Sequence, residues 1–150
     1  MITDSDVFLD TNILIYLSLD DFDAQKHLEC RKVMTELKKN RKRLFVSTQI
    51  LREFYAVATR EKYFNNPLQP NVARAQISSF QAAYNIIDVT QDVIYKLTDL
   101  LEKYEIKGRK VHDAAIAASM WENNIRTLIT YNKKDFVDFD EIKTFTPLEL

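Results

Sequence analysis

Hydrophobic and polar positions along this chain follow two periods in turn, which predict strands that alternate with helices. Short runs rich in β-branched residues predict strands near Val7–Asp10, Leu44–Ser47, Asn85–Val89 and Thr127–Thr130, with an edge strand at Ile142–Phe145. Apolar residues at helical spacing predict helices over Lys26–Lys38, Thr48–Arg60, Gln91–Tyr104 and Val111–Glu122, and a weaker helix around Val72–Tyr84. This alternation is typical of an α/β fold, so we expect a parallel sheet of four to five strands flanked by helices.

The composition fits one domain that spans residues 1–150. Of all residues 46% are apolar, which is enough for one continuous core, and we find no internal repeat or low-complexity segment. The 21 basic and 22 acidic residues give a formal net charge of −1. Because no general positive field attracts nucleic acid, any polyanion has to be bound by local basic patches and by metal.

Several classes of protein are excluded by what the sequence lacks. The single Cys30 rules out an intramolecular disulfide, no Cys/His cluster has zinc spacing, and the single Gly108 rules out glycine-rich phosphate loops. No apolar run approaches the roughly 20 residues that span a bilayer, and the first residues, MITDSD, lack the features of a signal peptide. We therefore expect a cytoplasmic protein without a membrane partner.

Asp10 and Asp113 are acidic residues at positions that solubility explains poorly. Asp10 closes the run VFLD at the end of the first predicted strand, where open α/β sheets place their ligand crevice; the alternative is that it only caps the next helix. Asp113 lies in the first turn of its helix, on the face that Ile116 and Met120 should pack against the sheet. Because carboxylates are seldom buried alone, Asp113 indicates a metal ligand or a structural ion pair.

Glu53 and Asp135 carry weaker signals of the same kind. Glu53 lies on the flank of the apolar stripe of its helix, where it could also pair with Arg52 or Arg60. Asp135 follows the strand TLIT together with Asn132, and turn chemistry alone would explain both residues. Their position raises their interest, since this strand also ends at the proposed crevice.

Carboxylates that meet in a partly desolvated pocket repel one another by several kcal/mol. A divalent cation removes this repulsion, and a ligand set made only of oxygen atoms favours Mg²⁺ or Mn²⁺. Such an ion can deprotonate a water and hold a scissile phosphate. The sequence therefore predicts metal-dependent hydrolysis of phosphodiester bonds, with catalytic acids at Asp10, Glu53, Asp113 and Asp135.

The segments that contain these acids resemble the PIN-domain ribonucleases, and among them the VapC-like toxins of type II toxin–antitoxin pairs. The matching segments follow one another in family order: FLDTNILIYL (Phe8–Leu17), VSTQILREFY (Val46–Tyr55), VHDAAIAASM (Val111–Met120) and LITYNKKDF (Leu128–Phe136), with TFTP (Thr144–Pro147) as a closing segment. The resemblance covers nearly the whole chain. It implies a single PIN-like domain over residues 1–150, a three-layer fold around a parallel sheet, and a hydrolase that is a Mg²⁺- or Mn²⁺-dependent endoribonuclease.

The resemblance also assigns roles to the acids. Asp10, Glu53 and Asp113 match the metal-binding triad of the family. The family often adds a fourth acid just after the strand-ending threonine, but Asn132 occupies that position here and Asp135 comes three residues later. The number of metal ions, one or two, therefore stays open, as does which of these two residues completes the site.

Polar neighbours of the acids also match the family. Thr11 and Thr130, together with Asn132, correspond to positions that surround the metal ligands and would orient them. Asn124 replaces the usual glycine before the last strand, and asparagine tolerates the left-handed conformation that a helix end requires.

The same resemblance implies an RNA substrate, a small antitoxin protein of the VapB kind that blocks the site, and a homodimer. Five basic residues should border the crevice and either bind RNA phosphates or serve as ordinary surface charge; they are Lys107, Arg109, Lys110, Lys133 and Lys134. The basic run KKNRKR, at Lys38–Arg43, joins a helix end to a strand start. We therefore place it on the opposite edge of the sheet, as helix-end charge and a solvated loop.

Other functions remain open. A degenerate PIN domain that only binds RNA or protein is compatible with the uncertain fourth acid. A phosphohydrolase with Asp10 as its covalent nucleophile would need an acid at position 12, where the chain has Asn12. A receiver-type module that merely holds a cation would need adjacent acids at the end of the first strand, and the sequence Asp10-Thr11-Asn12 lacks them.

Overall fold

A parallel five-stranded sheet with the strand order β3-β2-β1-β4-β5 forms the centre of the fold. The structure is a computed structural model that describes residues 2–62 and 64–150. Its strands are β1 (Asp6–Leu9), β2 (Arg43–Ser47), β3 (Asn85–Ile87), β4 (Thr127–Ile129) and β5 (Lys143–Phe145). All neighbouring strands pair in parallel, and β5 lies at an edge as predicted. The prediction of a parallel sheet is confirmed.

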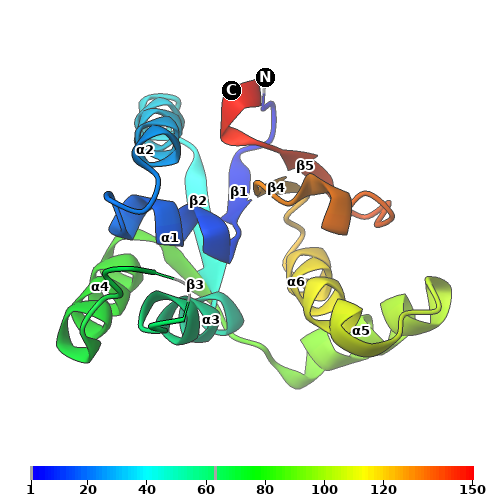
Figure 1. Cartoon of the computed structure of the whole chain (residues 1–150). Helices are drawn as coiled ribbons and strands as arrows, with labels where there is room; N and C mark the ends of the chain where they lie inside the picture. The colour runs from blue at the N-terminus through cyan, green and yellow to red at the C-terminus, as the bar shows by residue number, and fades with distance from the viewer. Residues whose placement is uncertain (1, 63) are drawn as a thin grey trace.

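Helices cover both faces of this sheet. They are α1 (Thr11–Ser18), α2 (Ala24–Lys39), α3 (Thr48–Ala58), α4 (Pro70–Ala83), α5 (Gln91–Lys103) and α6 (Val111–Glu122). Figure 1 shows α1 to α4 on one side of the sheet and α5 and α6 on the other, which confirms the three layers. Within the described residues, no helix combines the length and the apolar character needed to cross a membrane.

Local sequence signals explain where several helices begin and end. Ser47 caps α3, because its hydroxyl accepts a hydrogen bond from the backbone N–H of Ile50 at 3.2 Å. Pro70 starts α4 at a position where no backbone N–H is needed. Asn124 follows α6 with a φ of 57°, which confirms the left-handed conformation predicted for it.

The core forms around β1, the middle strand of the sheet. Val7, Phe8 and Leu9 are completely buried because helices cover both faces of this strand. In the helical layer formed by α5 and α6, α6 buries Ala114 and Ala117, whose small side chains let the helix lie close to the sheet. This packing fixes the ends of β1 and α6, from which two of the predicted acids project.

The order of the strands determines where a site can form. From β1 the chain moves outward to β2 and β3, and it then crosses over through α5 and α6 to β4 on the other side of β1. Open α/β sheets bind ligands at the carboxyl ends of the strands beside such a reversal. In this fold that place lies between the ends of β1 and β4, where Leu9 is in register with Ile129.

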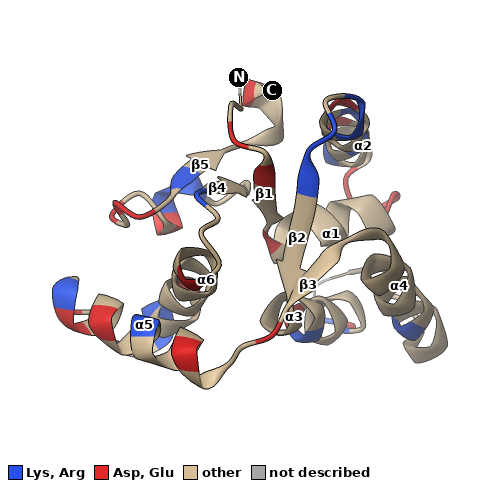
Figure 2. Cartoon of the chain, turned by 180° about the vertical axis from the view of Figure 1, so that it is seen from behind, with Lys and Arg blue, Asp and Glu red and all other residues tan. Residues whose placement is uncertain are grey.

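The basic run Lys38–Arg43 lies at the opposite edge, as predicted. Arg43 begins β2, and its Nε atom is 2.6 Å from Oδ1 of Asp6, which begins β1. Figure 2 shows the basic end of α2 and the start of β2 at the same end of the molecule as both chain termini. This charge is therefore remote from the carboxyl ends of the strands.

Candidate active site at the carboxyl edge of the sheet

Asp10 is held at the end of β1 by three hydrogen bonds. Its Oδ1 accepts from the backbone N–H of Thr11 at 2.7 Å, and its Oδ2 accepts from the Thr130 hydroxyl at 2.7 Å and the Asn12 amide at 3.2 Å. Only 6% of Asp10 is exposed. Burial raises the pKa of its carboxyl from 3.8 to about 6, although the Thr130 and Thr11 hydrogen bonds oppose the rise. Asp10 thus caps α1, and its buried carboxyl is harder to ionise than a carboxyl in water.

Glu53, from the second turn of α3, is oriented by donors on both of its oxygens. The Thr11 hydroxyl donates to Oε2 at 2.9 Å, and the side-chain amide of Gln49 donates to Oε1 at 3.0 Å. Thr11 therefore contacts two acids at once, with its backbone N–H on Asp10 and its hydroxyl on Glu53. This threonine connects the start of α1 to α3.

Asp113 lies in the first turn of α6 with 29% of its side chain exposed. Burial raises the pKa of its carboxyl; Lys110 opposes the rise, and the charges of Asp135 and Glu53 add to it. The charges of Glu53 and Asp113 likewise add to the raised pKa of Asp10. The fold therefore brings the four predicted acids, which are separated in sequence by up to 125 positions, into one electrostatically coupled group.

A layer of uncharged polar groups surrounds Asp10. The Thr130 hydroxyl donates to Asp10 and accepts from the Asn12 amide at 3.1 Å and from the backbone N–H of Asn132 at 3.0 Å. The Asn12 side-chain oxygen accepts from the backbone N–H of Tyr131 at 3.1 Å. The side chain of Asn132 itself is exposed and has no hydrogen bond to any described residue. This network joins the ends of β1 and β4.

The five predicted phosphate-binding residues differ in their surroundings. Lys110 lies 3.8 Å from Oδ2 of Asp113 and donates to the backbone carbonyl of Asp135. Lys133 pairs with Glu149 at 2.7 Å. The other three, Lys107, Arg109 and Lys134, are exposed and have no side-chain partner in the described part of the chain. These three are free to meet a polyanion.

The carboxylate oxygens of these acids are suitable ligands for a divalent cation. The acids do not, however, surround a common point. Within residues 2–62 and 64–150, no three His, Cys, Asp or Glu side chains converge tightly enough to hold a metal ion. Lys110 instead supplies the positive charge beside Asp113. The donor set is all carboxylate, and the mutual repulsion that helps to raise the pKa of Asp10 is what a cation would relieve. A cation would also have to compete with Lys110 for Asp113.

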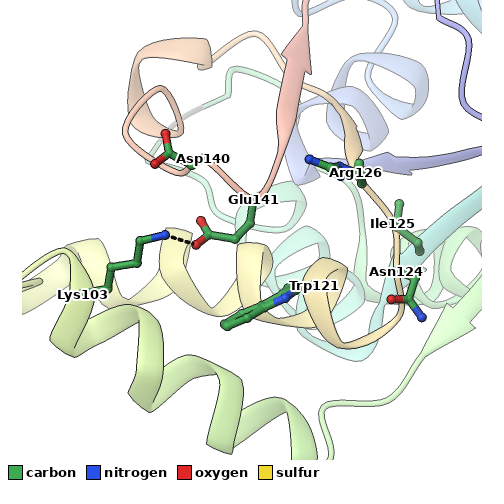
Figure 3. Close-up of a pocket in the computed structure, with 7 residues that line it drawn as sticks. All are labelled: Lys103, Trp121, Asn124, Ile125, Arg126, Asp140 and Glu141. Atoms are coloured by element: carbon green, nitrogen blue, oxygen red, sulfur yellow. Dashed lines mark hydrogen bonds and ion pairs between the residues drawn. The ribbon is translucent and has the colours of Figure 1, made fainter.

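A separate hollow of about 410 Å³ lies beside the amino end of β4 (Figure 3). Arg126, which directly precedes β4, lines it together with Trp121 at the end of α6. Its Glu141 is already bound by the Lys103 amine and the Tyr104 hydroxyl, both at 2.8 Å. None of the predicted acids lines this hollow, so it is no part of the candidate site.

Two residues of the site, Asn12 and Gln49, were not predicted from the sequence. The amide of Asn12 contacts both Asp10 and Thr130. Gln49 is four positions before Glu53, and this spacing within one helix was a usable signal for their contact. Their other partners are Thr130, directly after β4, and His112 in α6, which are far away in the sequence.

The protein is an α/β protein with a parallel sheet, and its predicted acids lie near the point where the strand order reverses. The family model named PIN domain matches residues 7–142, and the chain belongs to the PIN domain family. No curated protein matches the chain. The resemblance inferred from the four sequence segments is confirmed.

Solved structures of several toxin–antitoxin proteins share the fold. A toxin–antitoxin complex from Klebsiella pneumoniae is 27% identical, with a TM-score of 0.62 over 94% of this chain and 97% of that one. VapBC2 from Rickettsia felis, solved with a promoter DNA fragment, is 22% identical, with a TM-score of 0.69 over 94% and 98%. Mycobacterium tuberculosis VapC20, a sarcin-ricin loop cleaving toxin, is 17% identical, with a TM-score of 0.66 over 91% and 98%. The chain thus resembles these proteins over nearly their full length.

Proposed function

We propose that this PIN domain is a divalent-metal-dependent endoribonuclease and the toxin of a toxin–antitoxin pair. The observation that carries the proposal is the electrostatic coupling of Asp10, Glu53 and Asp113, which reach one edge of the sheet from β1, α3 and α6. Asp10 also caps α1, but capping does not require Glu53 and Asp113 nearby, and their charges make the Asp10 carboxyl harder to ionise. In our proposal the three acids bind Mg²⁺ or Mn²⁺, and Asp135 assists them from the turn after β4.

A bound cation would activate a water and stabilise the charge on a scissile phosphate. The side chains of this protein would prepare the ligands for it. Asp10 has a pKa of about 6 and is therefore mostly ionised at neutral pH, while Thr130 and Asn12 fix its orientation. Thr11 and Gln49 hold the Glu53 carboxylate from both sides.

The proposed substrate is RNA, bound beside the acids by Lys107, Arg109 and Lys134. These side chains have no partner among the described residues, whereas Lys110 and Lys133 contact protein groups first. VapC20, which has the same fold, is a toxin that cleaves the sarcin-ricin loop. That likeness supports RNA as the substrate class, and the specific RNA stays open.

The proposed partners are an antitoxin protein of the VapB kind and a second copy of the chain, in the cytoplasm. The support is that the similar structures from Klebsiella pneumoniae and Rickettsia felis are toxin–antitoxin proteins. We expect strong expression of the chain alone to arrest bacterial growth, and co-expression of a neighbouring antitoxin gene to restore it. Harmless expression of active enzyme without the antitoxin would contradict the toxin role and leave the nuclease intact.

The nuclease is tested by cleavage of a panel of structured RNAs with Mg²⁺ or Mn²⁺, and with EDTA as a control. We compare the wild type with Asp10→Asn and Asp113→Asn, and with Asp138→Asn, which removes an exposed acid outside the site. The expected result is metal-dependent cleavage by the wild type and Asp138→Asn only. Cleavage that persists in Asp10→Asn and Asp113→Asn would overturn the assignment.

A second candidate is a degenerate PIN domain that binds RNA without cutting it. Two observations favour it: the acids in the described part of the chain do not converge on one point, and Asn132 occupies the expected position of a fourth acid. A gel-shift assay in the presence of Mn²⁺ separates the two candidates. Retarded but intact RNA would support the binding module.

A further inference from the structure

Gln49 is a buried amide that connects two acid-bearing helices. Only 5% of the residue is exposed. Its side-chain nitrogen donates to Oε1 of Glu53 at 3.0 Å and to the backbone carbonyl of His112, at the start of α6, at 3.1 Å. Both hydrogens of the amide therefore have an acceptor. His112 directly precedes Asp113, so Gln49 spans the distance between α3 and the helix that carries the next acid.

Packing alone does not require an amide at this position. Ile50 and Phe54, on the adjacent face of α3, are fully buried, and an apolar side chain at position 49 would also fill space at its buried position. A buried amide costs free energy unless its hydrogen bonds are made, so its value lies in the direction of those bonds. Both bonds lead toward the acids.

The two donors on Glu53 have complementary roles. Thr11 holds Oε2 from α1, and Gln49 holds Oε1 from within α3. A glutamate side chain has several freely rotating bonds, and a carboxylate held on one oxygen only can still turn about that bond. With both donors present, the plane of the carboxylate is fixed. Because Gln49 also binds the start of α6, that plane is fixed relative to Asp113.

We propose that Gln49 is a positioning residue that sets the orientation of Glu53 relative to the α6 N-terminus, and thereby the affinity of the acid site for a divalent cation. The inference rests on the proposed function, because it concerns the same site. In this proposal Gln49 is not itself a metal ligand and acts through Glu53. Removing such an outer partner of a ligand typically weakens metal binding or activity by about 10- to 100-fold.

The test measures Mn²⁺ affinity by the electron paramagnetic resonance signal of the free ion, with thermal unfolding of each variant in parallel. Gln49→Met keeps the length of the side chain and removes both donors. Gln76→Met makes the same change on α4, where the amide has no partner among the described residues. We expect about 10- to 100-fold weaker binding for Gln49→Met and unchanged binding for Gln76→Met.

A double-mutant cycle shows whether the effect passes through Glu53. In a Glu53→Gln background the orientation of the carboxylate no longer matters, so we expect Gln49→Met to cause little further loss of affinity. An equal loss in both backgrounds would overturn the inference, and so would wild-type affinity in Gln49→Met. If Gln49→Met does not fold, Gln49→Asn, which is one methylene shorter, is held to the same expectation.

The Mn²⁺ measurements also distinguish a failure of the proposed function from a failure of the role inferred for Gln49. Wild-type protein that binds Mn²⁺ no better than Asp10→Asn would contradict the metal site itself, and the positioning role would fall with it. Binding that depends on Asp10 and is indifferent to Gln49 would contradict the positioning role alone.

Discussion

The Thr130 hydroxyl donates to Oδ2 of Asp10 over 2.7 Å and so joins the carboxyl ends of β4 and β1. The two residues are 120 positions apart in the sequence and meet because their strands are neighbours at the reversal of strand order. Thr130 is fully buried, and its oxygen also accepts from Asn12 and from the backbone N–H of Asn132. One hydroxyl thus holds both the deepest acid and the turn that carries Asp135.

Replacing this hydroxyl should affect the acid and the fold together. Thr130→Val keeps the shape of the side chain but removes a hydrogen bond that lowers the pKa of Asp10, so that pKa should rise further above about 6. We expect the acid limb of the pH–activity profile to move to higher pH. Stability should fall by about 1–3 kcal/mol, because two donors lose their acceptor.

The measurements are RNA cleavage against pH and urea unfolding of the same preparations. Thr35→Val on α2 is the matched control, since its hydroxyl bonds only a carbonyl of its own helix on the exposed surface. An unshifted pH profile in Thr130→Val would show that the hydroxyl does not control the ionisation of Asp10.

The ionisation of Asp10 should make the metal-free protein less stable as the pH rises. The folded pKa of about 6 lies above the ordinary value of 3.8, so the folded state holds the proton more tightly than the unfolded chain. The resulting stability is present below about pH 4 and is lost as the pH rises through about 6. The difference between the two pKa values corresponds to about 3 kcal/mol.

Asp10→Asn removes this dependence, because the amide does not titrate. We expect the unfolding free energy of the wild type, relative to Asp10→Asn, to fall by about 3 kcal/mol between about pH 4 and about pH 8. Urea unfolding of both metal-free proteins across this range measures it. A difference that stays constant with pH would contradict the raised pKa.

A divalent cation should reverse this loss of stability. If Mn²⁺ binds the folded protein at Asp10, Glu53 and Asp113, a concentration 100 times its Kd should stabilise the fold by about 2.7 kcal/mol. We expect a higher Tm with Mn²⁺, a return to the metal-free Tm with EDTA, and no response from Asp10→Asn. A similar increase in wild type and Asp10→Asn would place the ion elsewhere on the molecule.

Acids that lie where a strand ends or a helix begins could be located from the sequence. Asp10 follows a clear apolar strand, and Asp113 lies in the first turn of α6. Periodicity locates such boundaries, and a parallel sheet brings the carboxyl ends of its strands to one edge. The sheet, its edge strand β5 and the left-handed Asn124 were predictable for the same local reasons.

Contacts across the sequence could not be predicted in this way. The Gln49 amide meets a carbonyl 63 positions away, and this pair exists only because α3 and α6 approach the same edge from different layers. The amine of Lys110, which was predicted to bind phosphate or to serve as surface charge, lies beside Asp113 and donates to the carbonyl of Asp135. A long flexible side chain can reach several nearby acceptors, and the sequence pattern does not indicate which of them it contacts.

The free cations before α6 should control RNA affinity. Lys107 and Arg109 are exposed and have no side-chain partner among the described residues, so each can neutralise a phosphate. Each such contact with single-stranded RNA contributes about 0.7 to the slope of log affinity against log salt. We expect the double variant Lys107→Gln/Arg109→Gln to bind more weakly, with a slope lower by about 1.4.

Binding is measured in EDTA, so that the RNA stays intact, over a series of salt concentrations. Lys133→Gln serves as the control, because Lys133 already pairs with Glu149 and must give up that partner before it can bind a phosphate. We therefore expect a smaller change in slope for Lys133→Gln than for either single substitution at positions 107 and 109. If all variants share the wild-type slope, RNA does not cross the start of α6, and the path of the substrate has to be sought on another side of the acids.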